Sequence, residues 1–190
     1  MLENPNLPIL EVNAGYPLTV GDVLNLEHHF SARGKPGILV LPDDAKLELA
    51  ASNAQFQPFS SLMLLEVKSE ANEVIVEQVS WSQASALARV WCLHHHALDW
   101  QDWVAKEIAR AVQQSLSLTA YLAFENHQVA GMMIAHETGF AAWLAGETRA
   151  LEALAHRLSN DFEPGILAVP FEVFPHAKLL DRYSIWLKTR

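Results

Sequence analysis

Residues 118–158 read LTAYLAFENHQVAGMMIAHETGFAAWLAGETRALEALAHRL, and this stretch decides the fold. Its first part holds two apolar runs, residues 121–124 and 129–135, joined by the polar residues 125–128. Two short apolar runs separated by a polar turn are typical of a β-hairpin. A third apolar run at residues 140–144 predicts a third strand.

The last part of the stretch predicts a helix that follows directly on the third strand. Its apolar residues recur at the spacing of one helical face: Leu151, Leu154, Ala155 and Leu158. Thr148 is a suitable N-cap, because its hydroxyl can accept a hydrogen bond from an amide of the first turn. A strand that ends at a helix N-terminus brings free N–H groups and the positive end of the helix dipole together, which suits an anion such as pyrophosphate.

The composition limits what the protein can be. The chain has 190 residues, of which 51% are hydrophobic and 18% charged, so a large core is expected and disorder is not. The net charge of -9 argues against a nucleic-acid partner. Cys92 is the single cysteine, so no internal disulfide can form. The sequence shows no signal peptide and no apolar stretch near the ~20 residues of a membrane helix, so we expect a soluble cytoplasmic protein with no membrane contact.

Apolar periodicity predicts further elements on both sides of the opening stretch. Upstream they are a short strand at 9–12, a helix at 20–32 capped by Thr19, a buried strand at 38–41 and a helix opened by Asp43 and Asp44. Strands at 62–67 and 74–79, a helix ending near His96 and a helix starting at Asp99 follow. Downstream they are a strand at 166–169, a short helix around 177–180 and a strand at 184–187. The polar residues 68–72 mark a boundary, which predicts domains at 1–72 and 73–190.

An internal repeat supports this division. The sequence PGILVLP at residues 36–42 matches PGILAVP at residues 164–170. At the same spacing upstream, Leu26 and His28 match Leu154 and His156. Strands bounded by Pro and Gly are common, so chance remains an alternative, but the flanking agreement favours a duplication of helix, strand, short helix and strand.

The order of elements in residues 74–190 resembles the GNAT superfamily of acyl-CoA-dependent N-acyltransferases. The residues that carry the resemblance are the strand at 74–79, the hairpin YLAFENHQVAGMMIAH, the step AAWLAGETRALEALAHRL and the strand GILAV. The resemblance implies an α/β (α+β) fold with a mixed, mostly antiparallel sheet flanked by helices. Residues 9–67 resemble the second half of the same fold, which implies a half-GNAT-like lobe before the main domain.

The same resemblance implies acetyl-CoA, or another acyl-CoA, as cofactor and a small amine as acceptor. The cofactor would lie along the third strand at Phe140, Ala142 and Leu144, whose amides would contact the thioester oxygen. Its pyrophosphate would meet the strand-to-helix turn. The residues of this turn are Gly146, Thr148 and Arg149.

Residues for the chemistry and for the acceptor follow from the same resemblance. His136 and Glu137, at the end of the second hairpin strand, are candidate bases for the amine. Tyr183 is the candidate proton donor to the leaving thiolate, because a phenol has a free pKa near ~10. Trp100 and Trp103 would wall the acceptor site. Exposed sheet edges would permit a homodimer.

Two departures from the family pattern open an alternative. The turn at residues 145–150 keeps a single glycine, and Glu147 puts a negative charge where a phosphate would lie. The position expected for the thiolate donor is Asp181, two residues before Tyr183. The alternative is therefore a catalytically degenerate GNAT-fold module for binding or dimerisation.

A third alternative rests on Cys92, the histidines at 94–96 and Asp99. Helical spacing puts His95 and Asp99 on one face, and a zinc site could use such ligands. The same residues could simply end one helix and start the next, and we assign no metal ligand.

Overall fold

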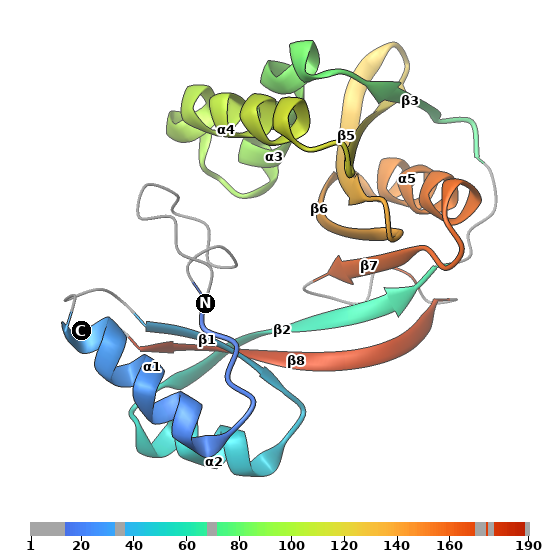
Figure 1. Ribbon diagram of the computed structural model, residues 1–190. Helices are drawn as coiled ribbons and strands as arrows, with labels where there is room; N and C mark the ends of the chain where they lie inside the picture. Colours follow the sequence, from blue (N-terminus) through green and yellow to red (C-terminus); the bar gives the residue numbers. More distant parts are fainter. Residues whose placement is uncertain (1–13, 33–36, 68–71, 170–173, 175–176, 189–190) are drawn as a thin grey trace. The chain divides into compact units, whose positions relative to one another are not determined.

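The computed structural model describes residues 14–32, 37–67, 72–169, 174 and 177–188. It shows a mixed α/β fold whose strands are mostly antiparallel and are flanked by helices, as predicted (Figure 1). Two compact units are present: an N-terminal unit of Met1–Met63 with Asp181–Arg190, and a central unit of Leu64–Leu180. Among the described residues, no helix combines the length and the apolar character needed to cross a membrane.

Strands of the central unit run in the order β7-β6-β5-β4-β3. Their bounds are β3 (Ile75–Val79), β4 (Leu118–Glu125), β5 (Gln128–His136), β6 (Phe140–Gly146) and β7 (Ile166–Val169). The predicted hairpin is confirmed: Asn126 and His127 have φ of 50° and 64° between β4 and β5. Positive φ at both central residues is the geometry that matches the twist of two-residue hairpins. All pairs are antiparallel except β6 with β7, which are parallel.

Helices cover both faces of these strands. Figure 1 shows α3 (Ala84–His94) and α4 (Gln101–Gln114) on one side of β5 and β6, and α5 (Thr148–Asp161) on the other. Two short 3-10 turns, η2 (Trp81–Gln83) and η3 (Leu98–Trp100), precede α3 and α4. Every predicted apolar residue of the α5 face is buried, which confirms that helix and its orientation.

The start of α5 differs from the prediction. Thr148 is the first helical residue, and the N-cap is Glu147, which makes no side-chain capping bond. Strand β6 continues through Gly146, and the helix begins at Thr148. The helix therefore starts one residue earlier than it would if Thr148 were its N-cap. In the N-terminal unit the predicted cap is confirmed, because the Asp22 amide donates to the Thr19 hydroxyl at 3.2 Å.

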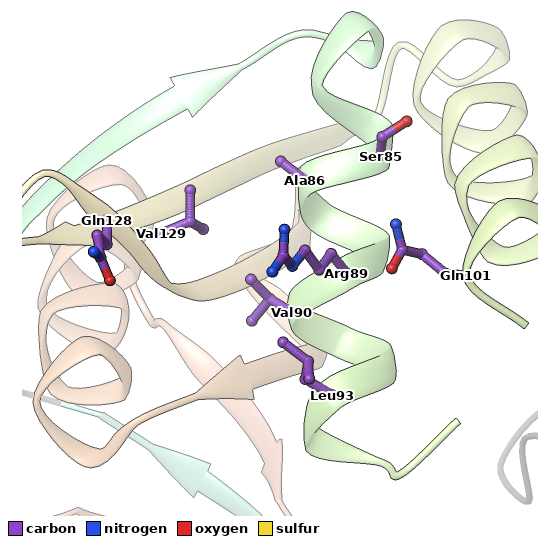
Figure 2. A pocket seen from close by; sticks show the side chains of 8 residues that line it. All are labelled: Ser85, Ala86, Arg89, Val90, Leu93, Gln101, Gln128 and Val129. Atoms are coloured by element: carbon purple, nitrogen blue, oxygen red, sulfur yellow. The ribbon is translucent and has the colours of Figure 1, made fainter. Parts of the chain in front are cut away.

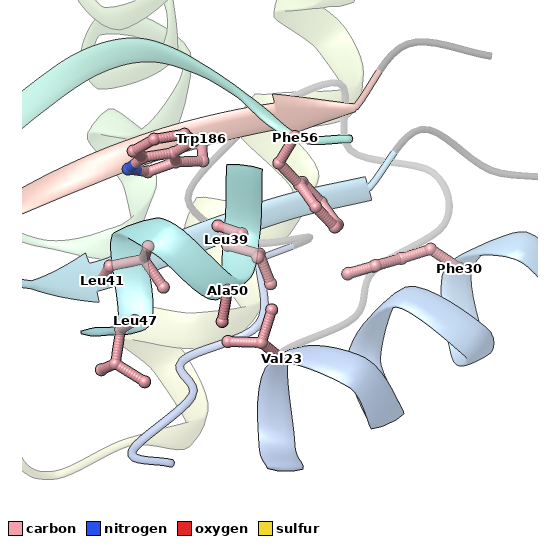
Figure 3. Close-up of a cluster of buried hydrophobic side chains, with 9 residues drawn as sticks. Val23, Phe30, Leu39, Leu41, Leu47, Ala50, Phe56 and Trp186 are labelled. Atoms are coloured by element: carbon pink, nitrogen blue, oxygen red, sulfur yellow. The ribbon is translucent and has the colours of Figure 1, made fainter. Parts of the chain in front are cut away.

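The N-terminal unit contains α1 (Val20–Ala32), β1 (Gly37–Pro42), α2 (Ala45–Asn53) and most of β2 (Gln57–Glu66). Its strands run β1-β8-β2. The two helices pack on one face of β1, where apolar side chains form the core shown in Figure 3: Val23, Phe30, Leu39, Leu41, Leu47, Ala50, Ala51, Phe56 and Trp186. The other face of β1 carries Ile38 and Val40 with Ala14 and Ile185, so β1 is buried on both faces as its unbroken apolar run predicts. A predicted strand at residues 9–12 lies outside the described residues.

One predicted element is wrong. Instead of a short helix around residues 177–180, strand β8 runs from Lys178 to Lys188 and includes the predicted strand at 184–187. Residues 37–42 of β1 pair with residues 183–188 of β8, so this ladder holds the C-terminal segment extended. The matching segment of the first repeat, from Ala45, is the helix α2, so the two copies differ after their buried strands. The domain division at 1–72 and 73–190 stays a prediction.

Candidate functional site

In the described part of the chain, the neighbouring strands β6 and β7 pair only near their N-terminal ends. Phe140 pairs with Ile166 and Ala141 with Leu167, and among the described residues of β6 no pair with β7 follows from Trp143 onward. Strand β6 continues to Gly146, and β7 continues to Val169. The two strands therefore form a fork that is open from Trp143 onward and runs toward the N-terminus of α5. All parts of this fork belong to the central unit.

A β-bulge stands at the start of the fork. Ile134 of β5 pairs with Trp143 of β6, while the next residue, Ala135, pairs with Ala141. Ala142 is thus the extra residue of β6 in its register with β5. A bulge leaves its extra residue outside the ladder. The backbone of Ala142 therefore lies outside the regular β5–β6 ladder.

Gly146 closes the far end of the fork. Its φ is +148°, and a Cβ built there would lie 2.6 Å from both the Ala130 oxygen and the Gly131 Cα. Only glycine fits this approach. The Glu147 amide donates to the Ala130 oxygen at 3.0 Å, which fixes the turn into α5. The first intrahelical bond runs from Leu151 N–H to Glu147 O, so the amides of residues 148–150 precede it and point from the helix end.

Charge at this helix end is mostly negative. The Arg149 guanidinium lies 2.6 Å from the Glu125 carboxylate and 3.7 Å from that of Glu73. Glu147 is exposed beside them. Sequence reasoning placed Arg149 at the pyrophosphate but did not foresee its carboxylate partners, because the hairpin turn brings Glu125 to α5 only in three dimensions. Arg149 therefore brings a positive charge that Glu125 and Glu73 partly neutralise.

The predicted bases lie at the opposite end of the fork from Gly146. His136 follows directly on Ala135, which pairs with Ala141 at the start of the fork. Its Nδ1 accepts from the Thr138 amide at 3.3 Å and lies 3.0 Å from the Thr138 hydroxyl. In this geometry Nε2 carries the proton, so His136 offers an N–H rather than a lone pair. Glu137 is exposed, and its amide donates to Ser117 O at 2.8 Å.

Tyr183 does not lie at a helix end. It stands in β8 of the N-terminal unit, where it pairs with Pro42. Burial and the neighbouring Asp181 raise its pKa, which keeps the phenol protonated. Strand β8 stands in place of the predicted helix that was to present Tyr183, and its role as thiolate donor stays a prediction.

Aromatic side chains gather where α3 meets β6. The Trp91 ring lies 4.1 Å from the His95 ring and 5.7 Å from the Trp143 ring, between centroids. Burial lowers the pKa of His95 to about 4, so the ring is neutral at pH 7. Trp100 of η3 is exposed and Trp103 of α4 is half-buried, so the structure brings neither into this cluster.

The proposed zinc ligands do not converge. In the described part of the chain, no group of three His, Cys, Asp or Glu side chains is close enough to hold a metal ion. Cys92 is buried, whereas Asp99 is exposed in η3. The His94 and His95 rings meet each other edge to face at 5.1 Å. The His95 ring thus packs between the rings of Trp91 and His94.

No family model matches the sequence, and no curated protein matches it. Solved structures do match. A conserved protein of unknown function from Staphylococcus epidermidis is 14% identical with a TM-score of 0.66, covering 95% of this chain and 86% of its own. A GCN5-related N-acetyltransferase from Kribbella flavida is 10% identical with a TM-score of 0.62, covering 94% and 79%.

A tandem GNAT protein from the clavulanic acid biosynthesis pathway matches as well. It is 10% identical with a TM-score of 0.53, and the match covers 88% of this chain and 68% of that one. The TM-scores of these three matches show a shared fold, and at identities this low they show the fold alone. The fold implied by the resemblance in the sequence is thereby confirmed.

Proposed function

We propose that this protein, which has the fold of the GNAT superfamily, binds an acyl-CoA in the β6–β7 fork and transfers the acyl group to a small amine. The observation that carries the proposal is the fork itself. Its start holds a backbone bulge at Ala142, and its far end meets the free amides of α5 at residues 148–150. One extended molecule with a carbonyl at one end and a pyrophosphate at the other suits both features.

The backbone of the chain would do most of the binding. The amides at the start of α5 would hold the pyrophosphate, and the Ala142 amide would donate to the thioester oxygen as charge develops on it. The close turn at Gly146 holds the start of α5 against β5. Leu144, on β6 between these two points, would contact the chain that joins them.

Transfer needs a base for the amine and a proton for the thiolate. The amine nitrogen attacks the thioester carbon, a C–N bond forms, the C–S bond breaks, and the thiolate takes a proton. Glu137 is the better base of the two predicted residues, because its carboxylate can accept a proton. In His136, Nδ1 already accepts from the Thr138 amide and Nε2 carries a proton. The His136 N–H can instead orient an acceptor. The proton donor to the thiolate is a water molecule in this proposal.

A second function is favoured by one specific observation. The carboxylates of Glu73 and Glu125 pair with Arg149, and Glu147 adds a further negative charge at the same helix end. Repulsion between these charges and a pyrophosphate would weaken cofactor binding. The fold would then serve as a binding or dimerisation module without catalysis.

A transfer assay separates the two. Acetyl-CoA is incubated with a panel of small primary amines, and released thiol is measured. We expect thiol release that depends on the amine and falls at least tenfold in Glu137→Gln. Glu107→Gln, which changes a carboxylate on α4, is the matched control and should leave the rate unchanged. Absence of amine-dependent release across the panel would favour the non-catalytic module.

A further inference from the structure

A cavity lies on the face of the central unit that α3 covers, on the other side of the strands from α5. Its volume is about 630 Å³, within the usual range of small-molecule sites. Its polar lining residues are Ser85, Arg89, Gln101 and Gln128. In Figure 2 the Arg89 side chain extends from α3 toward Gln128 and Val129, while Gln101 points from α4 toward α3. Neither Trp100 nor Trp103 lines this cavity.

A second β-bulge shapes the cavity. Ala123 of β4 pairs with Gly131, but the next residue, Phe124, pairs with Val129. Ala130 is therefore an extra residue, and the alternation of side chains along β5 breaks there. A Cβ on Gly131 would meet Ala150 and Leu154 of α5, so position 131 faces that helix. In a regular strand, residues 129 and 131 would lie on the same face, and Val129 would also face α5. Because of the bulge, Val129 instead lines the cavity beside α3.

The cavity carries one charge, and it is positive. Of the described residues that line it, Arg89 alone is ionisable. No ion pair to Arg89 exists in the described part of the chain, although the protein has a net charge of -9. The other arginine on a neighbouring helix, Arg110 of α4, is paired with Glu107. An exposed guanidinium without a carboxylate, set among hydroxyl and amide groups, is suited to an anion.

The remaining lining is apolar and incompletely covered. Val90 is buried, whereas the residues Leu93 and Val129 are 49% and 37% exposed. A ligand with a hydrocarbon part would remove this apolar surface from water, which is favourable. The lining therefore fits a molecule with an anionic head and an apolar tail.

We propose that this cavity is a binding site for a small organic carboxylate with a short hydrocarbon tail. The carboxylate pairs with Arg89 and accepts from the Gln101 or Gln128 amide, and the tail lies on Val90, Leu93 and Val129. The planar guanidinium fork matches a carboxylate with two parallel hydrogen bonds. The site is separate from the β6–β7 fork, and the proposal does not depend on acyl transfer.

Titration with hexanoate tests the proposal, with the backbone amides of the full chain followed by NMR. We expect saturable shifts at Ser85, Arg89 and Val129, and no such shifts with hexylamine, which has the same tail and the opposite charge. Inorganic phosphate should bind at least tenfold more weakly, because it has no tail. Arg89→Gln should weaken hexanoate at least tenfold, since a charge-assisted pair is lost.

Arg110→Gln is the matched control, because it removes an arginine charge from the next helix without touching the cavity. It should leave the hexanoate affinity unchanged. Both arginines are exposed, so both variants should keep the spectrum of the folded protein. Equal hexanoate affinity of Arg89→Gln and wild type, or equal affinity for phosphate and hexanoate, overturns the proposal.

Discussion

Replacing Gly146 by alanine should destabilise the central unit by about 2 kcal/mol. The residue has φ of +148°, and the added Cβ would stand 2.6 Å from two backbone atoms of β5, the Ala130 oxygen and the Gly131 Cα. Holding a residue with a side chain in such a backbone conformation costs ~1–3 kcal/mol. The clash adds to this cost, because the atoms it meets belong to the backbone, which moves less easily than the end of a side chain. The lower entropy of the unfolded chain offsets ~0.4–1 kcal/mol of the cost.

Gly21→Ala is the matched control for this measurement. Gly21 lies in α1, and the nearest atom to its added Cβ is the Thr19 hydroxyl oxygen at an ordinary 3.7 Å. In a helix this exchange should stabilise by ~0.5–1 kcal/mol. Urea unfolding followed by tryptophan fluorescence gives the free energy of unfolding of both variants. Trp143, which lies on β6 like Gly146, reports on the central unit. A Gly146→Ala variant as stable as wild type would refute the packing assigned to the β6–α5 turn.

Three further predictions follow from named contacts. Tyr121→Phe should cost ~1.5–3 kcal/mol in urea unfolding, because the buried hydroxyl donates to the Asp161 carboxylate at 2.7 Å and a bond to a charged group is lost. Stability should fall by roughly 1 kcal/mol as the pH drops from 6.5 toward 4, because His95 protonates in the unfolded chain but not in the fold. Solvent around the exposed His95 keeps the effect small, and His95→Gln should remove it. Glu125→Gln should strengthen acetyl-CoA binding by about two- to fivefold in calorimetric titration, because Arg149 loses its nearest carboxylate; weaker binding would show that Arg149 acts through that pair.

Local pattern was enough to predict most of the fold. The helix at residues 20–32 and the hairpin after residue 118 occur as expected, because one face of each is buried and the hairpin turn takes the geometry its length favours. The short helix around 177–180 was wrong for a reason the local sequence cannot show. Residues 178–188 are extended because their C-terminal part pairs with β1, which lies over a hundred residues earlier in the chain.

The candidate site was predictable in its scaffold but not in its details. The strand-to-helix step at Gly146 is readable in the sequence, since glycine after an apolar run marks such a turn. The bulges at Ala142 and Ala130 are not, because a bulge depends on the register between two strands. The pairing of Arg149 with Glu125 also depends on tertiary contact, so the sequence could not show how far its charge is neutralised.

Binding of acetyl-CoA tests the central claim most directly. Calorimetric titration of the full chain should give saturable binding to one site. Thr148→Glu should weaken it about tenfold, because the new charge at the start of α5 repels the pyrophosphate while leaving the helix intact. Gln113→Glu, which adds the same charge on the exposed end of α4, should have no effect. No measurable binding, or equal binding by the wild type and Thr148→Glu, would contradict a cofactor site in the β6–β7 fork.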